Sequence, residues 1–339
     1  MSEQLRLSDE GLAGYLAARG VVPAGTQLSV EPAGDGNINW VRRARAADGR
    51  SWIVKQARPA LEAFPEYRAP TERIVFERRY FELASKLPEG GICPRIVDFD
   101  ECERVLTMED LGRAERLDAA LARGADVTAA AAALGRFLGA VHGATTDPAL
   151  AARFTNPGMQ RLHGDHVFVL PLRDNDFPLP PELAAEAARL RADAGLVATS
   201  DRLYARYLEP RGALVHGDVQ AGNVLLADDG PKLLDAEIAH VGDPAFDLGV
   251  LTAHLRLPAV ARGTPDAANG PVRAAFAAWE SRLAGRLSAD FAAVARYAGI
   301  EMLRRTIGAA RVAAVAAPDA GLAVLAEAVA WLRDPPAAP

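Results

Sequence analysis

Four polar residues in the second half of the chain combine the residue types and the spacing that phosphoryl transfer needs. Asp218 and Asn223 are five positions apart in a turn-like segment, and Asp235 and Glu237 follow, the first of them 17 positions after Asp218. The reaction needs one carboxylate beside the attacking hydroxyl and oxygen ligands that hold Mg²⁺ against the nucleotide phosphates. The pattern therefore predicts an ATP- and Mg²⁺-dependent kinase with Asp218 as its catalytic carboxylate. The expected metal ligands are Asn223, Asp235 and Glu237, and a solvated turn before an edge strand is the alternative.

Asp218 ends the tripeptide His-Gly-Asp at 216–218, and the same tripeptide occurs a second time at His163–Asp165. Five positions after Asp165 the chain has Leu170 in place of an asparagine, and no Asp-x-Glu pair follows at a comparable distance. We therefore expect Asp165 to be a loop residue that takes no part in the chemistry. The surrounding region 156–180 is rich in Pro, Asp and His and is expected to form a long ordered loop.

A glycine-containing turn in the first half of the chain could bring backbone N–H groups close to phosphates. The turn lies between two expected strands, and its candidate nucleotide-binding residues are Gly34, Asp35, Gly36, Asn37 and Asn39. A hairpin turn without a ligand would have the same composition.

Lys55 is one of only three lysines among 38 basic residues, and it lies inside an apolar β-type run. Because the chain otherwise uses arginine, this lysine indicates a specific role, pairing with the α- and β-phosphates of a nucleotide; an edge-strand lysine is the alternative. Glu77 shares the apolar stripe of the following helix with Ile74 and Phe81, where a carboxylate is costly unless it is paired. We expect Glu77 to pair with Lys55, with Glu72 as the second candidate.

The segment 106–111 ends a predicted strand where two lobes would join. An adenine could hydrogen-bond the backbone of such a hinge, and its plane could pack on Met108; a strand that runs into a polar turn is the alternative. The residues expected to take part are Met108, Glu109, Asp110 and Leu111.

The elements that must position these residues change in kind along the chain. Residues 1–110 predict a small β-rich lobe, with strands at 26–31, 39–46, 51–56, 95–98 and 104–108 and one helix from about 71 to 87. Residues 111–339 predict a larger helical lobe, with helices at about 117–142, 181–206, 272–284, 288–316 and 320–333 and short strands within 214–247. Because strands and helices are segregated, the expected fold class is α+β with two lobes.

These motifs, in this order, resemble the protein-kinase-like fold of small-molecule kinases, a group that includes aminoglycoside phosphotransferases and choline kinases. The resemblance covers about residues 33–249. It implies an ATP-binding N-terminal lobe and a larger, helical C-terminal lobe.

The chain also resembles a narrower family, 5-methylthioribose kinase. This resemblance rests on Gly34–Asn39, Ile53–Ala57, Met108–Leu111, Phe154–Met159 with Asp165–Phe168, and Glu301–Gly308. In that family paired arginines reach the sugar and the transferring phosphoryl group, and here they correspond to Arg304 and Arg305. Two surface arginines on an amphipathic helix are the alternative. The resemblance implies phosphorylation of the anomeric hydroxyl of 5-methylthioribose, a place in methionine salvage, and a homodimer.

The catalytic loop departs from this family. Methylthioribose kinases read HGDLHTGS there, whereas this chain has Val219, Gln220, Ala221 and Asn223. Another sugar, an aminoglycoside or a choline-type molecule is therefore an alternative substrate, although two adjacent arginines would repel a cation. A catalytically inactive nucleotide-binding protein is the alternative of another class. It would be expected to lack at least one residue of the motifs above, and all of them are present.

Composition excludes several further classes. The chain has 339 residues, a formal net charge of −6 and two cysteines that form no metal or disulfide pattern. A mildly acidic chain has no overall attraction to nucleic acids or anionic lipids. No long uncharged apolar run is present, and the charged N-terminal segment does not resemble a signal peptide. We expect no nucleic-acid partner, no membrane span and a cytoplasmic location.

Overall fold

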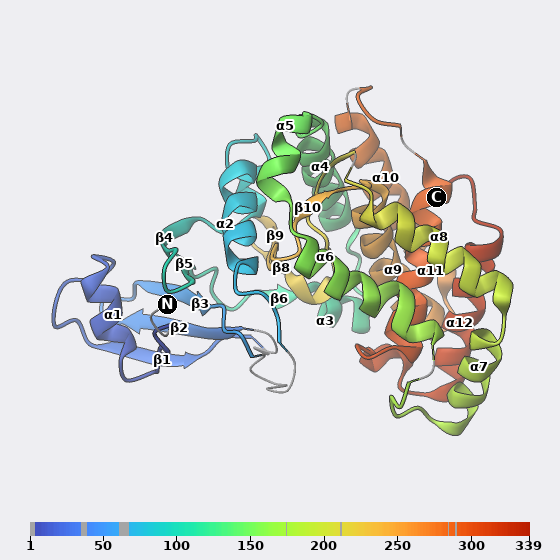
Figure 1. Ribbon diagram of the computed structural model, residues 1–339, viewed down its shortest axis with the longest axis horizontal. Helices are drawn as coiled ribbons and strands as arrows, with labels where there is room; N and C mark the ends of the chain where they lie inside the picture. Colours follow the sequence, from blue (N-terminus) through green and yellow to red (C-terminus); the bar gives the residue numbers. More distant parts are fainter. Residues whose placement is uncertain are drawn as a thin grey trace. The chain divides into compact units, whose positions relative to one another are not determined.

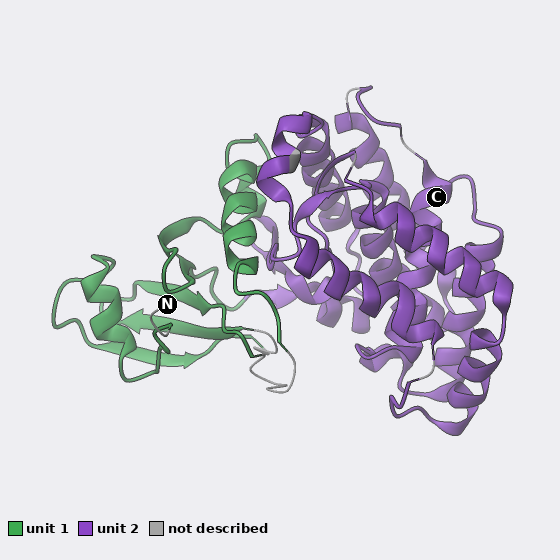
Figure 2. Ribbon diagram, viewed as in Figure 1, with its two compact units in different colours: residues 1–113 green, residues 114–339 purple. Residues whose placement is uncertain are grey.

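The computed structural model of the chain describes residues 4–34, 39–60, 68–173, 175–210, 212–283, 285–288 and 290–339. The chain forms two compact units, Met1–Arg113 (unit 1) and Ala114–Pro339 (unit 2), which are coloured separately in Figure 2. The main sheet belongs to unit 1, and most helices belong to unit 2 (Figure 1). The α+β class expected from the sequence is confirmed.

Unit 1 is built on a five-stranded antiparallel sheet with the strand order β1-β2-β3-β5-β4 (Figure 1). Its strands are β1 (Leu28–Pro32), β2 (Trp40–Ala46), β3 (Ser51–Gln56), β4 (Ile96–Asp100) and β5 (Val105–Glu109). Its helices are α1 (Leu12–Ala18), α2 (Arg73–Ala84) and the short 3₁₀ turn η1 (Gly90–Ile92). The strands and the long helix predicted here are present, with ends displaced by a few residues.

The two faces of this sheet carry different residues because side chains alternate along a strand. Trp52 and Val54 of β3 lie in an apolar core with Leu12 and Leu16 of α1. Lys55 has the opposite orientation and contacts α2. The period of two thus separates the apolar core of unit 1 from the face that carries the predicted nucleotide-binding lysine.

Unit 2 consists mainly of helices, with short strands between them. The helices are α3 (Leu117–Ala122), α4 (Thr128–Ala144), α5 (Pro148–Ala151), α6 (Pro157–Gly164), α7 (Pro181–Arg191), α8 (Ala194–Leu208), α9 (Ala245–Ala261), α10 (Asn269–Leu283), α11 (Phe291–Ile307) and α12 (Pro318–Arg333). Strands β6 (Glu115–Arg116), β8 (Val224–Ala227) and β9 (Gly230–Leu233) form one sheet, and β7 (Ala213–Val215) pairs with β10 (His240–Gly242). The short turns are η2 (Ala152–Phe154), η3 (Asp165–Val169), η4 (Leu170–Leu172), η5 (Ala221–Asn223), η6 (Pro265–Ala268) and η7 (Ala313–Val315).

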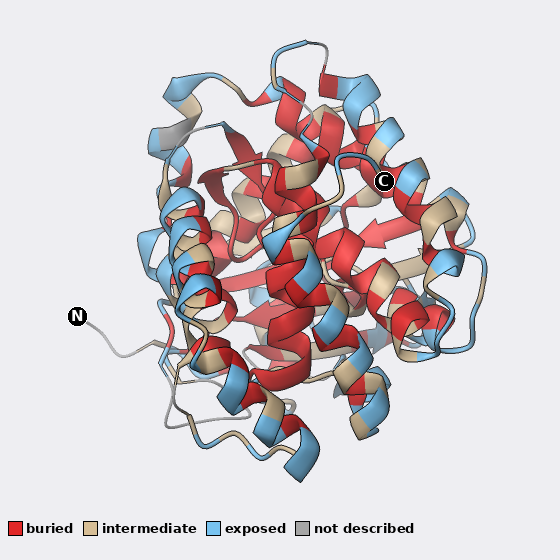
Figure 3. Ribbon diagram, turned by 90° about the vertical axis from the view of Figure 1, so that its right-hand side faces the viewer, coloured by how far each residue is buried: buried red, intermediate tan, exposed pale blue. Residues whose placement is uncertain are grey.

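The centre of unit 2 is the helix α9, which packs against α10, α11 and α12. Buried residues gather on the interior helices and exposed residues on the outer helices and loops, as Figure 3 shows. The helices α4 and α10 approach each other closely, since a Cβ at Gly135 would lie 2.1 Å from the Ala275 carbonyl oxygen and one at Gly139 2.4 Å from that of Trp279. Among the described residues, no helix is both long and apolar enough to cross a membrane.

Two long helices predicted for unit 2 are each divided. The predicted helix 117–142 is interrupted because Gly124, with φ of +75°, ends α3 in a left-handed conformation. The predicted helix 181–206 is interrupted at Asp193, whose carboxylate caps α8 by accepting from Leu196 N at 3.0 Å. Local capping therefore overrides the continuous helical composition.

Two further expectations for unit 2 are wrong or incomplete. The region 156–180 is not one long loop, because residues 157–172 form α6, η3 and η4. Pro157 starts α6 at a position where its missing N–H costs nothing. The helix α9 was not predicted, since it is buried on nearly all sides and shows no amphipathic pattern.

Candidate active site

Asp218 lies just after β7, in the loop that leads into η5. Its Oδ2 accepts hydrogen bonds from Asn223 Nδ2 at 2.9 Å and from Gln220 Nε2 at 3.0 Å. Its Oδ1 is buried, accepts no hydrogen bond from the described residues, and lies 4.0 Å from Arg305 Nη2. Burial raises the pKa of this carboxyl group to about 6, although Arg305 and Arg304 oppose the rise. One carboxylate oxygen is thus held in place, and the other is presented to a ligand.

Three buried residues that the sequence analysis did not identify hold this loop. Asp247 of α9 accepts from the backbone N–H groups of His216 at 2.7 Å and Gly217 at 2.9 Å. Trp279 Nε1, which can only donate, binds His142 Nδ1 at 2.9 Å. His142 Nε2 must therefore carry the proton that it donates to Asp247 at 3.1 Å. Burial opposes ionisation of Asp247, but the hydrogen bond from His142 leads the interactions that lower its pKa.

The predicted metal ligands lie on η5 and on the segment after β9. The two segments are joined by the pairing of β8 with β9 and by a hydrogen bond from Leu234 N to Asn223 O at 2.9 Å. Asp235 has φ of +62°, a left-handed conformation that costs energy for a non-glycine residue and is concentrated at functional sites. Glu237 is buried.

The donor atoms of this segment fit magnesium. The Asn223 amide nitrogen binds Asp218, so its amide oxygen is the atom able to ligate a cation. With the carboxylates of Asp235 and Glu237 it would offer Mg²⁺ oxygen donors only, the type that this ion prefers. In the described part of the chain, no three His, Cys, Asp or Glu side chains form a metal cluster by themselves.

In unit 1 the structure brings Lys55 and Glu77 together in a buried ion pair. Lys55 Nζ lies 3.0 Å from Glu77 Oε1 and 2.9 Å from Oε2. Glu72, the second candidate, is instead more than half exposed and lies 3.5 Å from Arg104. Because a paired ammonium group is held in one orientation, the arrangement can present Lys55 to a phosphate.

The predicted glycine turn is described only at its ends. Asp35, Gly36 and Asn37 lie outside the described residues. Gly34 has φ of +72°, and the carbonyl oxygen of the buried Asn39 side chain accepts from Arg73 of α2 at 2.8 and 3.1 Å. Asn39 therefore anchors the end of the turn to the helix that carries Glu77.

The predicted hinge residues lie at the end of β5 and directly after it. Met108 is buried between Ile53 and Ile96 of the neighbouring strands. The carboxylate of Glu109 accepts from the backbone N–H of Arg95 at 2.8 Å, and Arg43 donates to Asp110 at 2.8 and 3.1 Å. Both acidic side chains thus have partners within unit 1.

The last residue of the hinge, Leu111, is half-buried. Burial opposes ionisation of Asp110, but the hydrogen bond from Arg43 keeps its pKa below the ordinary value. A nucleotide would therefore meet this segment through its backbone, Met108 or Leu111 rather than through the two carboxylates.

Arg304 and Arg305 lie in the interior of unit 2, with exposed fractions of 8% and 5%, so the alternative of two surface arginines is excluded. Arg305 Nε donates to Glu301 at 2.6 Å, and Arg304 Nη1 donates to the same carboxylate at 3.1 and 3.2 Å. Arg304 Nε and Arg305 Nη2 are buried and make no hydrogen bond with the described residues. Glu301 lies in a segment that carries the family resemblance, but the sequence analysis assigned it no role. Its spacing of three and four positions from the arginines is the signal that indicates the ion pairs.

The aspartate and the histidine of the second His-Gly-Asp segment, 163–165, differ in their exposure to solvent. Asp165 is exposed and accepts from the Tyr204 hydroxyl at 2.7 Å. His163 is buried, and its Nε2 lies 3.4 Å from Arg304 Nη1. The aspartate takes no part in the cluster around Asp218, whereas the histidine reaches it.

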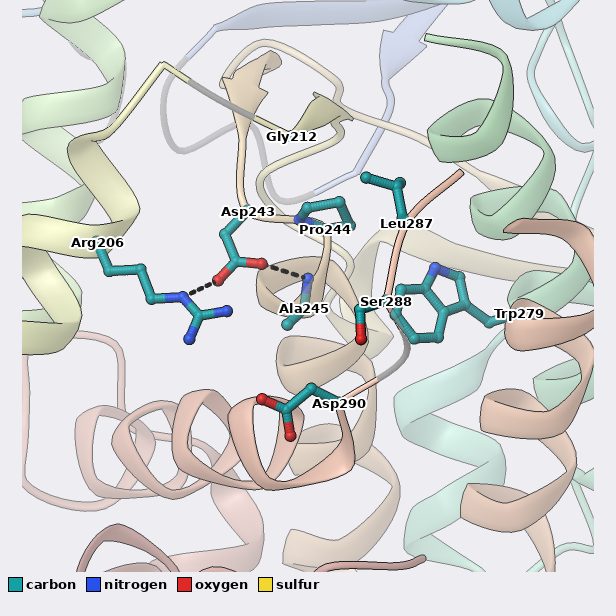
Figure 4. A pocket seen from close by; sticks show the side chains of 9 residues that line it. All are labelled: Arg206, Gly212, Asp243, Pro244, Ala245, Trp279, Leu287, Ser288 and Asp290. Carbon is teal, nitrogen blue, oxygen red and sulfur yellow. Dashed lines mark hydrogen bonds and ion pairs between the residues drawn. The ribbon is translucent and has the colours of Figure 1, made fainter. Parts of the chain in front are cut away.

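A separate cavity of about 310 Å³ lies elsewhere in unit 2, around the start of α9 (Figure 4). Figure 4 shows the side chains of Arg206 and Asp243 paired in its wall, and Asp243 also accepts from Ala245 N. Asp290 caps α11. Since these carboxylates are used by the fold itself, the cavity does not have the donor set of a phosphoryl-transfer site.

The comparison with protein families gives the class of this protein. The sequence profile described as "Phosphotransferase enzyme family" matches residues 29–291. The chain belongs to this family, and the predicted enzyme class is confirmed.

Individual known proteins refine this placement. The chain is similar to a methylthioribose kinase of Geobacillus sp. (strain WCH70), with 28% identity over 91% of this chain and 84% of that protein. It is 30% identical to a methylthioribose kinase of Yersinia enterocolitica, over 84% of this chain and 82% of that protein. The resemblance to methylthioribose kinases is therefore confirmed. The structure of a choline kinase from Streptococcus pneumoniae superposes with a TM-score of 0.52 at 15% identity, covering 96% of this chain and 98% of that one, which confirms the fold.

Proposed function

We propose that the protein is an ATP- and Mg²⁺-dependent kinase of a small sugar, and that the sugar is 5-methylthioribose, phosphorylated at its anomeric hydroxyl. One observation carries the proposal. Asp218 Oδ1, Arg304 Nε and Arg305 Nη2 belong to one buried cluster and make no hydrogen bond with the described residues. A neutral polyol satisfies such a set, because one hydroxyl donates to the carboxylate while other oxygens accept from the arginines.

In the proposed reaction the acceptor hydroxyl donates its hydrogen bond to Asp218 Oδ1. As its oxygen forms a bond to the γ-phosphorus, the hydroxyl proton passes to that carboxylate and the bond from the γ-phosphorus to the β-γ bridging oxygen breaks. The products are the sugar phosphate and ADP. Arg304 and Arg305 stabilise the negative charge of the transferring group.

Unit 1 supplies the nucleotide-binding residues in this proposal. Lys55, oriented by Glu77, binds the α- and β-phosphates. The glycine-containing segment that the sequence predicts to bind phosphate, of which Gly34 and Asn39 are described, would contribute backbone N–H groups. The adenine meets the backbone of the segment from Met108 to Leu111. Asn223, Asp235 and Glu237 would hold Mg²⁺, which neutralises charge on the phosphates.

A cationic acceptor, such as an aminoglycoside or choline, fits this cluster less well. Both guanidinium groups belong to α11, Arg305 Nη2 lies 4.0 Å from Asp218 Oδ1, and the two groups would repel a cationic acceptor. A neutral sugar meets no such repulsion. The names of the two methylthioribose kinases that the chain resembles favour that sugar over others.

A coupled assay of ADP release tests the proposal with methylthioribose, ribose, other pentoses and several aminoglycosides as acceptors. We expect turnover to be highest with methylthioribose. The product, characterised by phosphorus NMR, should carry its phosphate on the anomeric oxygen. Preference for an aminoglycoside or for choline would contradict the assignment.

Two sets of variants test the residue roles. Arg304→Ala and Arg305→Ala should each lower kcat/KM for the sugar, with a loss of transition-state stabilisation of about 2–4 kcal/mol. The affinity for ATP should change little. Asp235→Ala should abolish the Mg²⁺-dependent part of ATP binding in titration calorimetry, with a milder effect for Glu237→Ala.

The cytoplasmic location and the homodimer implied by the resemblance stay predictions. Light scattering checks the homodimer.

A further inference from the structure

Glu301 is a fully buried carboxylate at the centre of the arginine cluster of unit 2. Adjacent residues of a helix point about 100° apart, so Arg304 and Arg305 do not share a direction by themselves. Glu301 lies one turn earlier on the same helix and binds both of them. His254 Nε2, from α9, lies 3.3 Å from Glu301 Oε1 and ties the carboxylate to a second helix.

The atoms that Glu301 engages differ between the two arginines. It binds Nη1 of Arg304 but Nε of Arg305. This choice leaves Arg304 Nε and Arg305 Nη2 without a hydrogen bond, and Arg305 Nη2 lies 4.0 Å from Asp218 Oδ1. The contacts of Glu301 therefore determine which edge of each guanidinium group stays available to a ligand.

We propose that Glu301 is a positioning residue of this phosphotransferase, which fixes the guanidinium edges that Arg304 and Arg305 present to the acceptor and the transferring phosphoryl group. The inference rests on the proposed function of this cluster. It goes beyond that function because Glu301 itself touches neither substrate.

A purely structural ion pair would look different. Buried ion pairs contribute little to stability unless their remaining donors are satisfied. Here two buried donors are left unsatisfied, which is unfavourable for folding alone. The arrangement is understandable if those donors bind a ligand.

His163 supports the same geometry from α6. A guanidinium group has no acceptor, so His163 Nε2 must accept from Arg304 Nη1, and the imidazole is neutral. Its Nδ1 then carries the proton and lies 3.4 Å from the Tyr207 hydroxyl. The histidine of the second His-Gly-Asp segment thus braces an arginine of the active site.

Two variants of Glu301 separate geometry from charge. Glu301→Gln keeps the length but turns one acceptor oxygen into an NH₂ group, which opposes the guanidinium donors. Glu301→Asp keeps the charge but is one methylene shorter and cannot reach both arginines. We expect each to lower kcat/KM for the sugar by about 10²-fold, with KM for ATP changed by less than about threefold. If Glu301→Asp keeps wild-type activity, or either variant loses stability with unchanged kinetic constants, the proposal is overturned.

A matched control is the pair of Glu327 and Arg256, which joins α12 to α9 in the same unit away from Asp218. Glu327→Gln should lower the unfolding temperature without changing either kinetic constant. In the background of Arg304→Ala with Arg305→Ala, Glu301→Gln should cause no further loss of kcat/KM. An independent loss would mean that Glu301 does not act through the arginines.

A second readout does not depend on the identity of the acceptor. A crystal structure of Glu301→Gln should show that at least one guanidinium group has moved away from its wild-type position. If both arginines keep their positions, the inference fails even if the sugar kinase assignment stands. If the wild-type enzyme phosphorylates no sugar in the panel, the proposed function fails, while this structure still tests the inference.

Substitution of His163 should lower kcat/KM less than substitution of Glu301 does, and a residue that keeps a hydrogen-bond acceptor should restore it. His163→Phe should lower kcat/KM for the sugar about tenfold, and His163→Gln, which keeps an acceptor, should restore most of it. Equal losses in both variants would contradict the bracing role.

Discussion

The same tripeptide, His-Gly-Asp, occurs twice in unit 2 and has two different structures. At 216–218 it follows a strand, and Gly217 has φ of +86°, so the chain turns sharply and Asp247 holds two consecutive backbone N–H groups. At 163–165 it ends a helix, with Gly164 in a helical conformation at φ of −58°. A Cβ at Gly164 would lie 2.5 Å from the Tyr204 ring, so this glycine permits close packing.

The two aspartates differ accordingly. Asp218 is partly buried, has one oxygen held by two amides, and has the other directed toward an arginine. Asp165 is exposed and bound to a tyrosine hydroxyl. The elements around the tripeptide therefore determine whether its carboxylate can do chemistry, and a short motif has meaning only with the backbone conformation that carries it.

The strongest contrast should appear on removing each negative charge. Asp218→Asn should lower kcat by 10²-fold or more, because the acceptor hydroxyl loses its orienting carboxylate. ATP binding should persist, since the metal ligands remain. Asp165→Asn should leave kcat within a few-fold of wild type. Comparable losses in the two variants, measured by steady-state ADP release, would remove the distinction between the segments.

The second prediction concerns the support that Asp247 gives to the segment 216–218. Asp247 accepts from three donors, the backbone N–H groups of His216 and Gly217 and the imidazole of His142. Asp247→Asn would place an NH₂ group against one of these donors. We expect kcat to fall by about 10²-fold and the free energy of unfolding by about 1–3 kcal/mol, the cost of an unsatisfied buried donor. Unchanged kcat in this variant would show that the loop holds its conformation without Asp247.

The third prediction follows from the pKa of Asp218, which burial raises to about 6. Because the folded protein favours the protonated carboxyl, Asp218 makes its full contribution to stability below the unfolded-state pKa near 4. That contribution is lost as the pH rises through 6. Asp218→Asn, which is never charged, should therefore raise the free energy of unfolding at pH 8 by up to about 3 kcal/mol. The gain should vanish near pH 4. Urea unfolding at both pH values, without nucleotide or metal, measures it.

The sequence contains local signals for much of this molecule. The strands of unit 1, the partnership of Lys55 with Glu77 and the segment around Asp218 all follow from alternation, an apolar stripe and spacing within short stretches. These are properties of neighbouring residues, and they survive in the fold because no distant contact overrides them.

Other features depend on contacts between distant parts of the chain. Asp247 and His142 are 105 positions apart, and nothing near either residue indicates the other. The helix α9 is buried on almost every side, so its sequence lacks the polar face that marks a helix. The role of Glu301 was accessible in principle, since its spacing from the arginines is local, but the edges that it leaves exposed depend on tertiary packing.

The smallest effects are expected on removing one side-chain hydrogen-bond donor from Asp165 and one from Asp218. The Tyr204 hydroxyl donates to Asp165, and the Tyr204 ring stacks on Phe168 with centroids 5.4 Å apart. Tyr204→Phe keeps the stacking and loses the hydrogen bond. It should lower the free energy of unfolding by about 0.5–1.5 kcal/mol and leave kcat unchanged.

The matched change at Asp218 is Gln220→Leu, which removes one of the two amides that hold its Oδ2. Because Asn223 still binds this oxygen, stability should change little, but the carboxylate gains freedom to turn its Oδ1 away from the acceptor. We expect kcat to fall about tenfold, while KM for ATP stays the same. Loss of activity in Tyr204→Phe, or full activity in Gln220→Leu, would show that the two aspartates do not differ in the way their surroundings indicate.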